Sequence, residues 1–100
     1  MKIGIIGSTT ALPLEFMARY QAKIADYMGN VSTQFFFTDE SGIAMHTAKY
    51  LNGRGFRNCT IYHVGTICRH DIGKYKKRSG YSNVAEARDA IIKECDMLLG

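Results

Sequence analysis

The chain has 100 residues, which is enough for one domain with a single core but too few for two lobes. Its 46% apolar and 22% charged residues exclude a disordered chain. The net charge of +4 helps to attract phosphates, but an excess of this size does not by itself indicate a nucleic-acid partner.

The three cysteines and three histidines have neither CxxC nor HExxH spacing, so the sequence predicts no disulfide framework and no metal site. The apolar run at the start is too short for a signal peptide or a membrane span. We therefore expect a cytoplasmic protein with reduced thiols, no membrane contact and no bound cofactor.

The first predicted element is a strand at Lys2–Gly7, which is almost entirely apolar, as in a strand covered on both faces. A polar turn follows, and Pro13 suits the first turn of a helix. Apolar side chains from Phe16 to Tyr27, at spacings of four, four and three, mark one face of this helix. Gly29 is placed to end it.

The next elements repeat this alternation. The apolar run within Thr33–Phe37 predicts a second strand. A second helix is expected to start near Ile43 and to end at Gly53 or Gly55. Cys59–Val64 predicts a third strand. The long polar stretch Gly65–Tyr81 is expected to form a functional or mobile loop.

The last predicted elements are a helix and a strand. Asn83 can cap the third helix, with Glu86 as its capping-box partner, and Asp96–Leu99 begins a fourth strand. The order predicts an α/β fold, a Rossmann-like open parallel sheet of about four strands with helices on both faces. We expect one domain over residues 1–100, truncated at its C-terminal end or completed by another chain, and a homo-oligomer, because open sheet edges tend to be covered.

Ligands of open parallel sheets bind beyond the carboxyl ends of the strands, and this rule selects three turns. In the first turn, Gly7, Ser8, Thr9 and Thr10 offer hydroxyls and backbone N–H groups near a helix N-terminus, which suits an anion such as phosphate. An ST-turn that only caps the first helix is an equal alternative.

The second turn contains Asp39, Glu40, Ser41 and Gly42. A carboxylate here could accept ribose hydroxyls, and in an enzyme Asp39 or Glu40 would be the nucleophile or general base. The more common role for such residues is to cap the helix that follows.

The third segment supplies Arg69, a bidentate donor for phosphate or carboxylate. Arg88, on the third helix, either points back to the same crevice or pairs with Asp89 on the surface. We interpret the basic run 74–78 as a solvated loop rather than a nucleic-acid site. Its Tyr75 and Tyr81 could stack on a base or equally serve as packing anchors. Cys68 is followed by Arg69 and His70, but adjacent residues rarely have the geometry of a catalytic pair.

Taken together, these segments resemble the SLOG superfamily, the Rossmann-like group that includes LOG phosphoribohydrolases and relatives of nucleoside deoxyribosyltransferases. The resemblance implies a nucleotide-type ligand across the strand ends, which some members cleave at an N-glycosidic bond and others only bind. The segments that carry it are Ile3–Ser8, Asp39–Ile43, Ala48–Leu51, Asn58–Tyr62, Cys68-Arg69, Ile72-Gly73, Arg88-Asp89 and Cys95-Asp96.

The chain departs from this family pattern in three places. Thr9 stands where relatives often have Arg, Ala44 stands where they often have Asp, and the Gly-rich phosphate loop that follows their fourth strand is not in this sequence. We therefore expect binding of a nucleotide or nucleotide-derived metabolite. One alternative is an N-glycosidic-bond enzyme, a nucleotide N-ribohydrolase or deoxyribosyltransferase. A second is a protein-interaction module on a degenerate SLOG scaffold.

Overall fold

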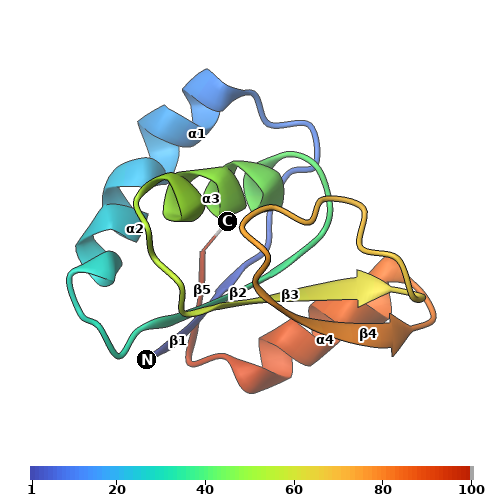
Figure 1. The fold of residues 1–100 in the computed structure, drawn as a ribbon. Helices are drawn as coiled ribbons and strands as arrows, with labels where there is room; N and C mark the ends of the chain where they lie inside the picture. Colours follow the sequence, from blue (N-terminus) through green and yellow to red (C-terminus); the bar gives the residue numbers. More distant parts are fainter. Residues whose placement is uncertain (100) are drawn as a thin grey trace.

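A computed structural model describes residues 1–99 and contains one five-stranded parallel sheet with the strand order β4-β3-β2-β1-β5 (Figure 1). All four neighbouring strand pairs are parallel, so the α/β fold with an open sheet is confirmed. The strands are β1 (Lys2–Ile5), β2 (Gln34–Thr38), β3 (Cys59–Val64), β4 (Lys76–Tyr81) and β5 (Met97–Leu99). The helices are α1 (Pro13–Arg19), α2 (Gln21–Met28), α3 (Ile43–Gly53) and α4 (Val84–Glu94).

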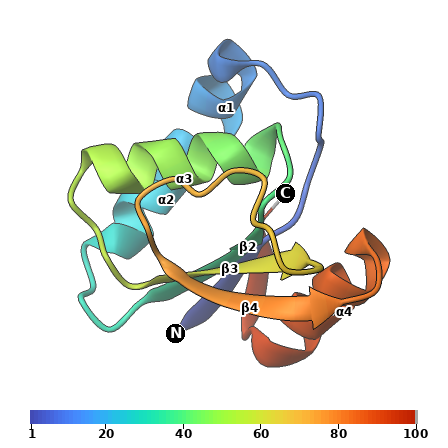
Figure 2. The same cartoon turned by 45° about the vertical axis from the view of Figure 1, so that its right-hand side comes forward.

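The helices cover both faces of the sheet, with α1, α2 and α3 on one face and α4 on the other (Figure 2). Crossovers between parallel strands are right-handed. The steps from β1 to β2 and from β2 to β3 run in one direction, so their helices fall on the same face. The step from β4 back to β5 runs the opposite way, and α4 therefore lies on the other face.

The core is divided by the sheet into two apolar clusters. Phe35 and Phe37 face the larger cluster under α1–α3, whereas Phe36 packs against Ile91 of α4 on the other face. All three phenylalanines are at most 5% exposed. Burial of each ring contributes about 1.5–3 kcal/mol, which explains an uninterrupted aromatic run in a strand covered on both sides.

The structure adds a fifth strand to the four predicted ones. β4 lies within the stretch expected to be a loop, and that expectation is wrong for residues 76–81. Its sequence, KKRSGY, lacks an apolar run because β4 is an edge strand, exposed at five of its six positions. Hydrogen bonding to β3, rather than burial of side chains, keeps this segment extended.

Two other boundaries are informative. The predicted first helix is broken at Tyr20. Its ψ of −34° is helical, but its φ of −120° is not, and this residue separates α1 from α2. Asn83 caps α4 as predicted, since its Oδ1 accepts a hydrogen bond from the Glu86 backbone N–H at 2.8 Å.

Within residues 1–99, no helix combines the length and apolar character needed to cross a bilayer.

The turn after β1 packs directly on the start of α3. The Ile43 backbone N–H donates to the Ser8 carbonyl oxygen at 2.9 Å. Gly42 has a φ of +79°, and a Cβ atom there would lie 2.2 Å from that oxygen. Only glycine therefore allows the two turns to meet.

We predict that Gly42→Ala lowers the free energy of unfolding by about 2–5 kcal/mol, because left-handed strain and a backbone clash add together. Urea denaturation of both proteins measures the loss. The matched control is Gly55→Ala, where φ is +73° but no heavy atom lies within 4 Å of the added Cβ. The control should lose only about 1–2 kcal/mol. Equal losses at the two positions would contradict the close packing of the turns.

Candidate functional site

The structure brings the predicted site residues together at the carboxyl edge of the sheet. The first turn is joined to the second by the Ser41 hydroxyl, which donates to the Thr9 carbonyl oxygen at 3.0 Å. Arg69 and Arg88 reach the second turn from opposite faces of the sheet and pair with Asp39 and Glu40. The nine residues expected to bind a ligand thus form one connected group: Gly7, Ser8, Thr9, Thr10, Asp39, Ser41, Gly42, Arg69 and Arg88.

The first turn differs from the expected phosphate cradle at a helix N-terminus. The Thr10 backbone N–H donates to Ser8 Oγ at 3.1 Å, which is the geometry of an ST-turn. This turn does not cap α1, because the N-cap position of α1 is Leu12 and no side chain bonds there. The Ser8 carbonyl oxygen instead accepts the first N–H group of α3.

Asp39 is the most enclosed charged group of the site. Its carboxylate is 2% exposed and accepts three hydrogen bonds from Arg69, from the backbone N–H at 2.7 Å, from Nε at 3.2 Å and from Nη2 at 2.9 Å. Burial acts to raise the pKa of this carboxyl, but the side-chain and backbone hydrogen bonds from Arg69 outweigh it and lower the pKa below its usual range. Asp39 is therefore ionised at neutral pH.

Glu40 forms the second Arg–carboxylate pair on the opposite face. Arg88 donates from Nε at 2.9 Å and from Nη2 at 3.0 Å, and the Thr38 hydroxyl donates to the same carboxylate at 2.8 Å. Arg88 thus points to the crevice rather than to Asp89. Neither Asp39 nor Glu40 caps α3, whose N-cap is Gly42 without a side-chain bond.

The cavity between the first two turns is very small. Its volume is about 10 Å³, enough for one water molecule or one ligand oxygen. It is lined by Ile5, Ile6, Gly7, Thr38, Glu40, Ser41, Ala44 and Arg88. A larger ligand must therefore lie on the rim and direct a single atom inward.

The two ion pairs share one orientation. The carboxylates of Asp39 and Glu40 are 2% and 11% exposed, whereas the side chains of Arg69 and Arg88 are 53% and 33% exposed. The negative groups lie inside, and the positive groups face solution. The rim therefore presents guanidinium N–H donors to an incoming anion.

The other chemically active side chains have structural surroundings. Burial, together with the charges of Asp39 and Asp71, raises the pKa of the Cys68 thiol, so this cysteine is not an activated nucleophile. His46 Nε2 contacts the Ala11 carbonyl oxygen at 2.8 Å, and its ring packs on Phe16, as expected for a histidine at the edge of the core. Within the described part of the chain, no three His, Cys, Asp or Glu side chains gather into a possible metal site.

A larger hollow, not predicted from the sequence, lies on the α4 side of the sheet. Its volume is about 540 Å³, and Lys76 and Arg78 of β4 border it together with Lys2 and Glu94. The signal was the spacing of two between Lys76 and Arg78, which places both side chains on one face of a strand. Because the segment has no apolar run, this spacing does not stand out as a strand in the sequence.

Comparison with known protein families, with curated proteins and with solved structures found no match. The resemblance to the SLOG superfamily stays a prediction.

We predict that Asp39→Asn lowers the free energy of unfolding by about 1.5–3 kcal/mol at neutral pH, the usual contribution of hydrogen bonds to a charged group. Because the folded state lowers the pKa of Asp39, this stabilisation is complete above the ordinary pKa of about 3.9. It is lost as the pH falls through the folded-state pKa. The difference between wild type and variant should therefore shrink in urea denaturation below about pH 4.

The matched control for this experiment is Asp26→Asn on α2. Asp26 is exposed and forms no ion pair among residues 1–99, so its replacement should have little effect at either pH. A difference for Asp39→Asn that stays constant down to about pH 3 would show that the charge of Asp39 is not the source of the stabilisation.

Proposed function

We propose that this domain binds a nucleotide or a nucleotide-derived metabolite through a phosphate group at the carboxyl ends of β1 and β2. The observation that carries the proposal is the orientation of the two ion pairs. In each, Nε and Nη2 of the arginine bond the carboxylate on the inner side. A guanidinium has five N–H donors, so three remain on each arginine for a ligand on the outer side.

The resemblance to the SLOG superfamily and the position of the turns both support a nucleotide-type ligand. Ligands of open parallel sheets bind at this edge, and phosphate is the ligand group best matched by paired guanidinium donors. The small cavity would receive one phosphoryl oxygen. The hydroxyls of Thr9 and Thr10 lie on the same turn and would bond the phosphate or the ribose.

The enzymatic alternative has less support from this geometry. A carboxylate that attacks or stabilises an anomeric carbon must reach the sugar. Both oxygens of Asp39 bond Arg69, and both oxygens of Glu40 bond Arg88. Catalysis would require one pair to open, whereas binding requires no rearrangement.

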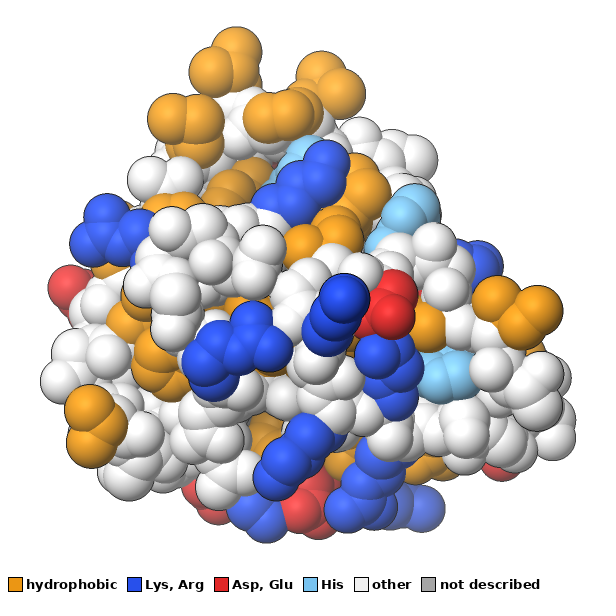
Figure 3. All heavy atoms as spheres, viewed as in Figure 1, with side chains coloured by type: hydrophobic (Ala, Val, Ile, Leu, Met, Phe, Trp, Pro, Cys, Tyr) orange, Lys and Arg blue, Asp and Glu red, His pale blue; other side chains and the backbone are white. Residues whose placement is uncertain are grey.

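The interaction-module alternative is favoured by one separate feature. Leu12, Leu14 and Met17 at α1 are 69%, 78% and 55% exposed, and hydrophobic side chains protrude at the top of the molecule in Figure 3. A group of exposed apolar side chains of this kind is typical of a protein-binding surface. It lies outside the strand ends, so the two functions are not exclusive.

We predict that at least one 5′-nucleoside monophosphate raises the thermal unfolding midpoint, whereas the corresponding nucleoside, which lacks the phosphate, does not. At a ligand concentration about 100-fold above Kd, the stabilisation is about 2.7 kcal/mol. Differential scanning fluorimetry with a panel of bases measures it. The double variant Arg88→Gln, Glu40→Gln removes both charges but keeps hydrogen-bonding groups, and it should abolish the shift.

The control variant is Arg54→Gln, which removes an exposed cation just after α3 and should keep the shift. Equal stabilisation by nucleosides would argue against phosphate as the recognised group. Chromatography of the same incubations separates the enzymatic alternative, since release of free base would show N-glycosidic cleavage. No shift with any monophosphate would leave the surface at α1 as the better supported function.

A further inference from the structure

β4 and the residues beside it hold the basic side chains of this part of the chain in an ordered array. We call this array the basic ridge and define it as Arg57, Lys74, Lys76, Lys77 and Arg78, all exposed. Residues 74–78 carry a charge of +4, as large as the net charge of the whole chain. Lys and Arg side chains gather over the middle and lower part of the face that Figure 3 shows.

On the α3 side of β4, contacts with the protein orient the cations. The Arg57 guanidinium donates to the Gly73 carbonyl oxygen at 2.6 Å and lies 4.8 Å from the centre of the Tyr75 ring. Lys77 Nζ pairs with Asp71 at 2.8 Å and donates to the Tyr75 carbonyl oxygen at 3.2 Å. These side chains are held in place, although Asp71 neutralises part of the charge.

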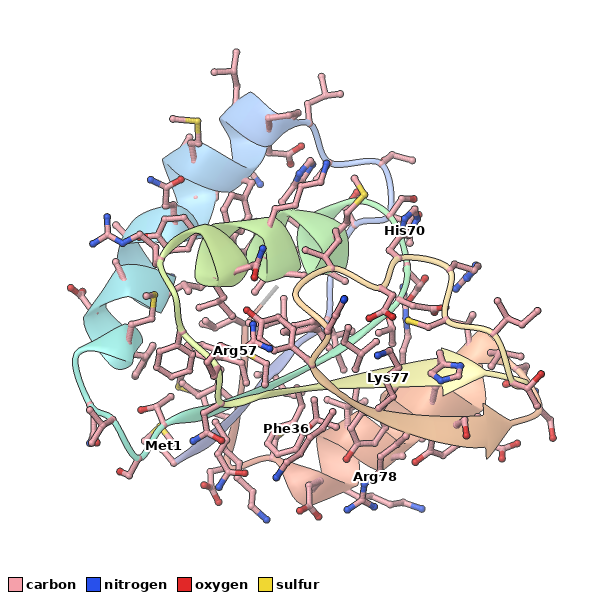
Figure 4. The ribbon with its side chains drawn as sticks, in the orientation of Figure 1. Met1, Phe36, Arg57, His70, Lys77 and Arg78 are labelled. Carbon is pink, nitrogen blue, oxygen red and sulfur yellow. The ribbon has the colours of Figure 1, made fainter. Side chains whose placement is uncertain are left out.

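On the α4 side, Glu94 is the acidic residue that borders the hollow, and its carboxylate pairs with Lys2 rather than with a cation of β4. Lys76 and Arg78 pair with Thr60 and Tyr62 of β3, whose side chains face α4, and neither cation forms an ion pair among the described residues. Two residues of a strand span about 6.6 Å. Figure 4 shows Lys77 and Arg78 on opposite sides of the sheet. Cations therefore flank the edge of β4 on both sides.

We propose that the basic ridge binds the phosphate backbone of a nucleic acid without reading its bases. A row of positive side chains neutralises successive phosphates and releases their counterions, which supplies the affinity of sequence-independent binding. A strand holds the side chains at regular spacing, whereas a solvated loop would not. The expectation of no nucleic-acid partner depends on such a loop, and β4 replaces it.

The neighbouring side chains favour phosphates over bases or a protein. Phe36, Tyr62 and Tyr75 are at most 5% exposed, so their rings cannot stack on bases. The half-buried ring of Tyr81 is already stacked on the Tyr62 ring. The anchors of protein interfaces are mostly Trp, Tyr and Arg side chains that become buried in well-packed pockets. Residues 70–90, which include β4, contain none of the strongly exposed large hydrophobic side chains, so this region offers no apolar surface to a protein partner. The hollow beside Lys76 and Arg78 also contains the polar side chains of Gln34 and Thr60, which suit a sugar–phosphate backbone, and Glu94, whose charge is balanced by Lys2.

The test is fluorescence anisotropy with a labelled duplex DNA of random sequence, titrated at several salt concentrations between about 50 and 200 mM. Binding should weaken linearly in a plot of log affinity against log salt. The double variant Lys76→Gln, Arg78→Gln should reduce the magnitude of the slope by about 1.8, since each phosphate contact contributes about 0.9. Changes in duplex sequence should leave the affinity unchanged.

The matched control is Arg19→Gln, Lys23→Gln, which removes two exposed cations from α1 and α2 and changes the net charge equally. The control should keep the wild-type slope, and both variants should keep the wild-type unfolding midpoint. An equal loss in the control would overturn the proposal, because net charge alone would then explain binding. No binding at about 50 mM salt, or tighter binding of an acidic peptide than of the duplex, would also overturn it. Nucleoside monophosphate binding at the strand ends should be unaffected by Lys76→Gln, Arg78→Gln, so the two proposals fail separately.

Discussion

The buried carboxylate of Asp39 is the constraint on which both proposed binding surfaces depend. It follows β2 directly and holds Arg69 by three hydrogen bonds. Arg69 lies within the segment between β3 and β4, so the pair fixes that segment to the centre of the sheet. The same segment is fastened again by the Tyr75 hydroxyl, which donates to the Phe56 carbonyl oxygen at 2.9 Å.

The sequence predicts the fold well where burial determines the pattern. Ile3, Ile5 and the aromatic run 35–37 are apolar because both faces of the central strands are covered, and that pattern is visible without a structure. β4 has no such pattern, since an edge strand needs only one hydrogen-bonded neighbour and exposes its side chains. Asn83 was predictable as a cap because its bond to the Glu86 N–H is local.

The candidate site was predictable in its position but not in its contacts. The rule that ligands bind at the carboxyl ends of parallel strands selects Asp39, Glu40 and Arg69 from the sequence. The pairs Asp39–Arg69 and Glu40–Arg88 join residues that are 30 and 48 positions apart in the sequence, so no local pattern predicts them. Asp39 and Glu40 both follow the last residue of β2, and these two contacts direct their carboxylates to opposite faces of the sheet. Neither contact leaves a local signal.

The pairing also determines how an anion would bind at the strand ends. Pulling Arg69 away from Asp39 would leave a nearly buried carboxylate without a partner, at a cost of about 3–5 kcal/mol. A phosphate that uses the outer N–H groups avoids this cost, because the guanidinium bridges both anions. The carboxylates then act by orienting the arginines. At the basic ridge, Lys76 and Arg78 form no ion pair among the described residues, and the nearby Glu94 carboxylate is paired with Lys2. The two proposals therefore invoke different anions, a single well-placed phosphate at the strand ends and a chain of phosphates along β4.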